Sequence, residues 1–455
     1  MFSSAENLIT ETATWLWGPP MLVVLSVVGI LFTFLLKGLQ FITIGKSAKL
    51  TYTQRAGSGE GNITPLQSLY GALGALIGNG NLAGAATAVF MGGPGALLWM
   101  WAGAFVGMII VYAETLLALM NREKSPDGTF SGGPMYYIQK NLKMKWLAVL
   151  FALAMGVKTL MATATIQSNS IALAATSIID PSLFPDWMPA QLPYCVILAV
   201  LTWLVVIGGL RSIANSLAKI TPLMVILFVI SGTVIIFAHT DSLLNVFALI
   251  FRSAFTPSSA AGGFAGAGVM MAVRYGVARG FYSNEAGTGS SPIMYSTAKT
   301  DNIYYQSLIS MFGVFIDTVV STFTIVVILV TGVWTSGLTS TALTTSAFQS
   351  IYGNLGGYIV FIASFLFGYS TLIAWCFYGE QCFVYLWGPR MRKIFRWAFS
   401  IAVIFGYFDA TVLWEWGDLL NAFTILVNLF ALIFLINRVV KETGIFKMKE
   451  TNTGH

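Results

Sequence analysis

The run LYGALGALIGNGNLAGA at 69–85 decides how this sequence folds, because it is apolar enough for a membrane yet holds glycine at 71, 74, 78, 80 and 84. A second run, SSAAGGFAGAGVMMA at 258–272, holds glycine at 262, 263, 266 and 268. Broken helices at matching places in two halves of a chain are the sequence sign of an inverted-repeat transporter. Close helix packing alone would explain one such glycine-rich segment. It explains less well why there are two, and why the first also contains the polar residues Asn79 and Asn81.

Composition places the rest of the chain in a lipid bilayer as well. Of its 455 residues, 56% are hydrophobic and only 9% are charged, whereas soluble domains carry about 25% charged residues. A bilayer core needs roughly 20 apolar residues per helix. We therefore predict an all-α integral membrane protein with eleven transmembrane helices, at 16–36, 66–90, 95–120, 146–176, 191–210, 220–238, 244–273, 303–334, 354–386, 394–408 and 412–437.

The positions of the positive charges support this map. Of the 24 Lys and Arg residues, 22 fall in or beside the loops after the first, third, fifth, seventh, ninth and last predicted spans. Cytoplasmic loops carry an excess of Lys and Arg, so we expect the N-terminus outside and the C-terminus in the cytoplasm. The net charge of +6 is then a signal of topology, and no nucleic acid partner is expected.

Several function classes are disfavoured by what the sequence lacks. The three cysteines, Cys195, Cys376 and Cys382, lie in apolar runs without the spacing of a metal site. No P-loop is found, which argues against transport driven by ATP from this chain. No Ser-His-Asp or Cys-His constellation stands out, so we expect neither an enzyme nor a bound cofactor.

Ionisable residues inside predicted spans are costly and by default functional. Asp317, in FGVFIDTVVST, lies near the middle of its span and is the best candidate for cation coupling. The alternative is a buried aspartate held by hydrogen bonds or by Lys158. Glu114 and Glu380 lie nearer the inner ends of their spans, which favours structural roles.

Three longer motifs resemble the signature of the alanine or glycine:cation symporter family. They are GGPGALLWMWAGAFVG at 92–107, SGGPMYYIQK at 131–140 and RGFYSNEAGTGSSP at 279–292. The resemblance implies the leucine-transporter fold, a 5+5 inverted repeat preceded by one extra N-terminal helix. It divides the chain into an extra transmembrane helix at 1–45, a first repeat at 46–240, a second repeat at 241–440 and a cytoplasmic tail at 441–455.

The same resemblance implies where ligands bind, by analogy with the fold. GNGNLAG at 78–84 resembles the unwound part of the first core helix, whose N–H groups would face the substrate carboxylate, and the second glycine run would offer carbonyls to the ammonium group. The implied substrate site comprises Ala75, Gly78, Asn79, Gly80, Gln167, Asn169, Gly263, Phe264, Ala265, Gly266, Thr371 and Trp375. The implied Na⁺ site comprises Gly74, Ile77, Phe367, Ser370 and Thr371. Asn81 and Asp317 resemble positions near a second cation site.

We therefore expect a Na⁺-coupled symporter that imports L-alanine, glycine and similar small neutral amino acids through the plasma membrane by alternating access, and that works as a monomer. Two bulky residues beside the expected site, Phe264 and Trp375, would exclude larger side chains. The alternatives are a proton-coupled carrier or exchanger of the same fold, a channel and, least favoured, a membrane enzyme.

Overall fold

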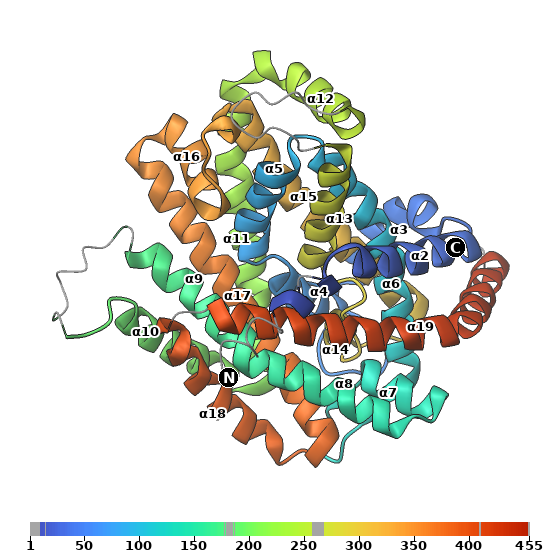
Figure 1. Cartoon of the computed structure of the whole chain (residues 1–455). Helices are drawn as coiled ribbons and strands as arrows, with labels where there is room; N and C mark the ends of the chain where they lie inside the picture. Colours follow the sequence, from blue (N-terminus) through green and yellow to red (C-terminus); the bar gives the residue numbers. More distant parts are fainter. Residues whose placement is uncertain are drawn as a thin grey trace.

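The structure is a computed structural model that describes residues 10–13, 15–176, 178, 185, 187–256, 268–408 and 411–453. It is almost wholly helical, with one pair of two-residue strands, β1 (Glu123–Lys124) and β2 (Phe130–Ser131) (Figure 1). The helices in the first half of the chain are α2 (Pro19–Leu35), α3 (Leu39–Thr53), α4 (Pro65–Leu76), η1 (Gly80–Gly84), α5 (Ala85–Gly92), α6 (Ala96–Asn121), α7 (Pro134–Tyr137), η2 (Ile138–Leu142), α8 (Lys145–Lys158), η3 (Thr159–Thr163), α9 (Ala164–Thr176), α10 (Leu192–Val206) and α11 (Gly209–Ala238). Those that follow are α12 (Thr240–Phe255), α13 (Val269–Asn284), α14 (Ser291–Tyr295), α15 (Ile303–Val330), η5 (Val333–Thr335), α16 (Ser340–Tyr352), α17 (Asn354–Trp387), α18 (Met391–Ile404), η6 (Phe405–Tyr407) and α19 (Thr411–Thr453).

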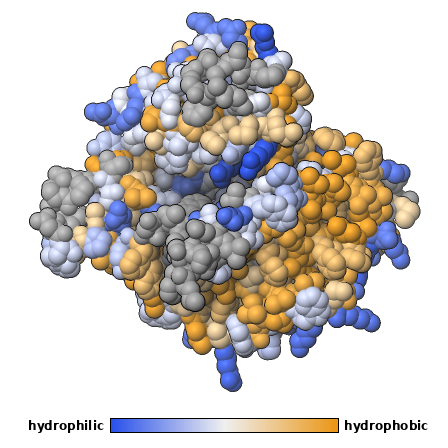
Figure 2. Space-filling view, viewed as in Figure 1, coloured by the Kyte–Doolittle hydropathy of each residue, from blue (hydrophilic) through white to orange (hydrophobic). Residues whose placement is uncertain are grey.

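The membrane character predicted from composition is visible in the helices and on the surface. Among the described residues, six helices are long and apolar enough to cross a bilayer, or eight if each of two bent pairs is one span. Figure 2 shows broad apolar areas on one face of the molecule, as expected for a surface that meets lipid. The predicted spans at 95–120, 303–334 and 354–386 coincide closely with α6, α15 and α17. The count of eleven helices stays a prediction.

The structure differs from the predicted map in the segment 244–273, which is not one helix. Helix α12 ends at Phe255, Thr256 takes an extended conformation, and α13 begins only at Val269. Large apolar side chains of α12, among them Leu244 and Phe255, are exposed. A hydropathy window does not distinguish such an exposed apolar face from a membrane span, and this led to the error.

Two further helices were not expected. Helix α3 follows α2 at a bend of 80° and contains the predicted boundary between residues 45 and 46. Helix α16 lies between α15 and α17, where no helix was predicted. The predicted boundary between residues 440 and 441 likewise falls inside α19.

The first glycine run forms a broken span, as the sequence predicts. Thr64 and Gln67 form a capping box, and Pro65 occupies the first turn of α4. The helix stops at Leu76, and the axis turns by 55° before the chain resumes at Gly80 in η1 and α5.

A second break separates α13 from α14. The backbone enters the left-handed region at Glu285 (φ 52°), Gly287 (φ 84°) and Gly289 (φ 78°) before α14 begins at Ser291. The Asn284 side chain accepts a hydrogen bond from the Ala286 N–H at 3.0 Å, and the Thr288 N–H donates to the Glu285 carbonyl at 3.0 Å. These bonds fold the segment 285–290 into compact turns.

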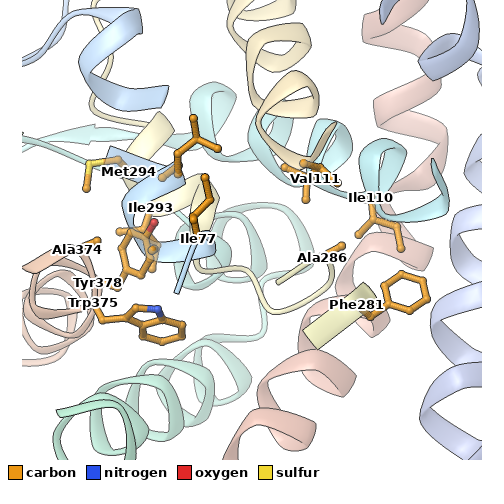
Figure 3. Packing of buried hydrophobic residues seen from close by; sticks show 14 of the residues in the cluster. Ile77, Ile110, Val111, Phe281, Ala286, Ile293, Met294, Ala374, Trp375 and Tyr378 are labelled. Atoms are coloured by element: carbon orange, nitrogen blue, oxygen red, sulfur yellow. The ribbon is translucent and has the colours of Figure 1, made fainter. Parts of the chain in front are cut away.

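The two broken spans lie side by side and run in opposite directions. Helix α4 packs against α14 and α5 packs against α13, while α6 contacts both α13 and α14 (Figure 1). The two breaks therefore meet near the centre of the molecule. Figure 3 shows that buried apolar side chains surround them, including Ile77, Phe281, Ile293 and Trp375.

On one side of the breaks the two spans are tied together by backbone contacts. Ile63, just before α4, forms a parallel bridge with Ala298, just after α14. The Arg122 guanidinium donates to the carbonyls of Ser296 at 3.0 Å, Ala298 at 2.8 Å and Glu60 at 2.9 Å. We call this arrangement the Arg122 clamp; it holds the start of the first broken span against the end of the second.

Candidate functional site

A cavity of about 1200 Å³ lies on the opposite side of the breaks from the Arg122 clamp. It reaches Ile178 after α9, Gly357 near the start of α17 and Glu415 near the start of α19. Figure 2 shows hydrophilic residues in the hollow at the centre of this face. Because the cavity ends at the first break, it brings polar backbone and side chains to the place where helical hydrogen bonding is interrupted.

The first break is held open by two asparagines. The Gly78 N–H donates to Asn81 Oδ1 at 3.0 Å, which keeps this peptide out of the helical pattern. Asn79 Oδ1 accepts from the Ser364 hydroxyl at 2.8 Å, and Asn79 Nδ2 donates to Gln167 Oε1 at 3.3 Å. Asn79 and Gly80, where η1 begins, both line the cavity.

Oxygen atoms of α4 and α17 converge beside this break. Thr371 Oγ1 lies 3.2 Å from the Gly74 carbonyl oxygen and 3.0 Å from that of Phe367. The Ser370 hydroxyl donates to the same Phe367 carbonyl at 2.9 Å. Ile77, at the C-terminal end of α4, is fully buried next to this group. The five residues expected at the Na⁺ site thus lie on the two elements that meet here.

Asp317 and Asn81 form a second polar cluster, buried in the protein. Asn81 Nδ2 donates to Asp317 Oδ1 at 2.7 Å and to Ser321 Oγ at 3.0 Å. The Ser283 hydroxyl lies 2.9 Å from Asp317 Oδ2. The pairing of Asp317 with Lys158 is wrong, since Lys158 Nζ donates instead to Asn421 Oδ1 at 2.6 Å.

The other two acidic residues inside spans have structural partners, as predicted. Glu380 accepts two hydrogen bonds from Arg396, at 2.6 and 3.0 Å. Glu114 accepts from Asn428, whose amide also donates to the Gly287 carbonyl at 2.8 Å. The first pair joins α17 to α18, and the second ties α19 to α6 and to the second break.

The residues expected to bind substrate divide into three groups. Those that line the cavity are Ala75, Gly78, Asn79, Gly80, Gln167, Thr371 and Trp375. Asn169 is a correction, because its amide donates to the carbonyls of Gly406 at 2.7 Å and Phe408 at 3.2 Å and so caps the turn after α18. Gly263, Phe264, Ala265 and Gly266 lie outside the described residues.

Glu285 lies at the site although it was not among the residues expected there from the sequence. It lines the cavity, and its Oε1 accepts from the Trp375 indole N–H at 3.0 Å. Lys158 lines the cavity too, with Nζ 4.2 Å from the centroid of the Trp375 ring. A signal was available, since Glu285 opens the stretch EAGTGS inside the motif at 279–292, where two glycines flank a threonine.

Comparison with known proteins places these features in a family. Residues 2–454 match the profile described as "Sodium:alanine symporter family". The chain is 37% identical to "Sodium/alanine symporter AgcS" of Methanococcus maripaludis over 458 residues, which cover 97% of each chain. It is 39% identical to "Uncharacterized transporter YflA" of Bacillus subtilis over 442 residues, 95% of this chain and 91% of that protein.

Solved structures show a similar fold at low sequence identity. A mutant of a manganese transporter from Eremococcus coleocola superposes with a TM-score of 0.52 and 11% identity, covering 84% of this chain and 82% of the other. The two chains therefore share a helical fold over most of their length.

Proposed function

Because the chain belongs to the sodium:alanine symporter family, we propose that it is a sodium-coupled secondary active symporter that imports L-alanine and glycine through the plasma membrane by alternating access. The observation that carries this proposal is the convergence of Thr371 Oγ1 with the carbonyl oxygens of Gly74 and Phe367 beside the first break. Oxygen ligands suit a hard cation, and a break in a helix exposes carbonyls that a cation requires. The ion and the amino acid would then bind on the two sides of one interrupted backbone.

We propose further that the chain contains two inverted repeats of five membrane-spanning segments after one extra segment, with the first repeat ending near residue 240 and the second running from residue 241 into α19. The antiparallel packing of α4–α5 against α13–α14 supports this arrangement. In it the second break is the segment 285–290, seventeen or more residues beyond the glycines at 262–268 on which we first placed it. With the N-terminus outside, the cavity opens to the exterior and the Arg122 clamp lies on the cytoplasmic side.

The ends of the two broken spans suit a zwitterion. The N–H end of η1 and α5 carries partial positive charge and faces the cavity, where it would bind the substrate carboxylate through Asn79 and Gly80. The C-terminal end of α13 carries partial negative charge and reaches the cavity at Ser283 and Glu285, where it would face the ammonium group. The substrate would thus lie between two helix ends of opposite sign.

The side-chain end of the substrate would face aromatic surface. Trp375 and Tyr282 both line the cavity, and Trp375 stands one helical turn after Thr371 on α17. Bulk here clashes with long side chains, whereas a missing methylene costs only about 1–3 kcal/mol. We therefore expect glycine and alanine to be accepted and leucine to be refused.

Asp317 supports an alternative hypothesis about the coupling ion. A carboxyl group buried among Asn81, Ser283 and Ser321 could hold a second Na⁺ or carry a proton. A proton-coupled carrier or an exchanger of the same fold is therefore the alternative.

Uptake of amino acid by purified protein in proteoliposomes distinguishes these hypotheses. Labelled alanine should accumulate under an inward Na⁺ gradient and should not accumulate under a proton gradient alone. Accumulation driven by protons in Na⁺-free buffer would establish the alternative, and equal rates with and without any ion gradient, dependent on internal amino acid, would identify an exchanger.

A further inference from the structure

Trp375 is held from three directions against the cavity. Its indole N–H donates to Glu285 Oε1 at 3.0 Å. Lys158 Nζ lies 4.2 Å from the ring centroid, within the range of a cation–π contact. The ring of Tyr378 meets it edge to face at a centroid distance of 5.4 Å. A change of rotamer would separate the indole N–H from the carboxylate, so the plane of the ring is fixed by these contacts.

Glu285 presents its carboxylate from a rigid piece of backbone. It lies in the left-handed region at φ 52°, which a residue with a side chain adopts only when its surroundings enforce it. One carboxylate oxygen accepts from Trp375 and the other from the Ser290 hydroxyl, at the far end of the same break. The position of the indole N–H is therefore set by the second break and not by α17 alone.

Lys158 completes the arrangement from the other side. It comes from the end of α8, and its ammonium group donates to Asn421 of α19 at 2.6 Å. Two opposite charges thus flank one aromatic ring, although apolar packing would hold a buried ring at lower desolvation cost. Both charges line the cavity that the ring faces, which indicates a role in what the cavity admits.

We propose that Glu285 and Lys158 are positioning residues that set the upper size limit of the transported amino acid by fixing Trp375 as a wall of the pocket. The proposal rests on the proposed function, in which the substrate side chain points toward Trp375. Glu285 acts through the indole and does so by its hydrogen bond. Loosening that bond lets the ring turn away, and amino acids with side chains longer than a methyl group then fit.

The test compares two changes that remove the same bond from its two ends. Trp375→Phe keeps an aromatic ring and loses the N–H, while Glu285→Met keeps the length of the side chain and loses the acceptor oxygens. Competition by unlabelled glycine, alanine, 2-aminobutyrate, valine and leucine against labelled alanine gives the selectivity of each variant. We expect valine to compete about tenfold better or more relative to alanine in each single variant, the scale of a hydrogen bond to a charged group.

The double variant Trp375→Phe/Glu285→Met should be no less selective than the single variants, because each single change already removes the hydrogen bond between the two residues. Lys158→Met, which keeps the length of the side chain, should shift selectivity in the same direction by a smaller factor. Tyr378→Phe is the matched control: it keeps the ring that meets Trp375 and removes a hydroxyl without a hydrogen-bond partner among the described residues. It should keep the wild-type profile.

Two results would overturn the proposal. One is an unchanged profile in Trp375→Phe, which decides alone if Glu285→Met does not fold. The other is additive effects in the double variant, which would mean that the two residues act separately. Absence of Na⁺-driven alanine uptake by the wild type would refute the proposed function instead, so the two failures are distinguishable.

Discussion

The two helix breaks are stabilised by different interactions. The first spans Ile77 to Asn79 and is held by side chains, with Asn81 on the Gly78 N–H and Ser364 on Asn79. The second spans 285–290 and adopts positive φ at three residues, with the side chains of Asn284 and Asn428 bonded to its backbone. At Gly80 the first break adjoins the open cavity, whereas at Gly289 the second break is packed against Pro134. The two breaks therefore differ in how large a side chain they can accept at these glycines.

Adding a methyl group to the second helix break should have the largest effect. A β-carbon at Gly289 would lie 2.3 Å from Pro134 Cγ, and the residue has φ 78°. The left-handed conformation alone costs a residue with a side chain roughly 1–2 kcal/mol. Gly289→Ala should therefore lower the melting temperature markedly or prevent folding, as measured by thermal unfolding in detergent. A variant as stable as wild type would show that this break is adaptable.

At the first break a larger group should leave the fold intact and abolish binding. A β-carbon at Gly80 would meet no protein atom within 4 Å, because the cavity lies there. Gly80→Val should express and remain monodisperse like wild type, yet bind no alanine in an equilibrium assay. Normal transport by this variant would mean that the substrate does not approach the backbone at this point.

A smaller effect is expected from the cation ligands. Thr371→Ala removes the hydroxyl that faces the Gly74 carbonyl. The loss of one such interaction costs about 1–3 kcal/mol, or roughly 5- to 150-fold. The Na⁺ concentration for half-maximal alanine binding should rise by a factor in this range, while alanine affinity at saturating Na⁺ changes far less. An unaltered Na⁺ dependence in the folded variant would remove Thr371 from the site.

The smallest effect should come from the support of Asn79. Ser364→Ala deletes a hydrogen bond to Asn79 Oδ1 and leaves the backbone of the break unchanged. Alanine affinity should fall by roughly twofold to tenfold, the range for a single neutral hydrogen bond. A loss as large as that of Gly80→Val would show that the Asn79 side chain itself determines the shape of the pocket.

The first break was predicted from the sequence, and the break at 285–290 was not. The glycines at 262, 263 and 266 lie outside the described residues. In GNGNLAG, glycine alternates with asparagine, whose amide replaces helical hydrogen bonds, so both the break and its partners can be inferred. Glycine alone, as in GGFAGAG, is equally compatible with close helix packing. In EAGTGS, the two glycines are a weaker signal of a break, because the presence of glycine does not determine φ.

Long-range contacts explain what else could and could not be anticipated. The approach of Asn81 to Asp317 followed from resemblance to a known fold, and the structure confirms that the two residues meet. The link between Trp375 and Glu285 joins residues 90 positions apart through the geometry of a turn. No local pattern in either segment indicates it.

The chemistry of the Arg122 clamp determines how the clamp responds to pH and to changes of sequence. All three of its acceptors are backbone carbonyls, those of Glu60, Ser296 and Ala298. A guanidinium stays protonated at any physiological pH, and carbonyls do not titrate. The side chains at these three positions can therefore diverge without loosening the clamp, and its hydrogen bonds stay intact across the physiological range of pH.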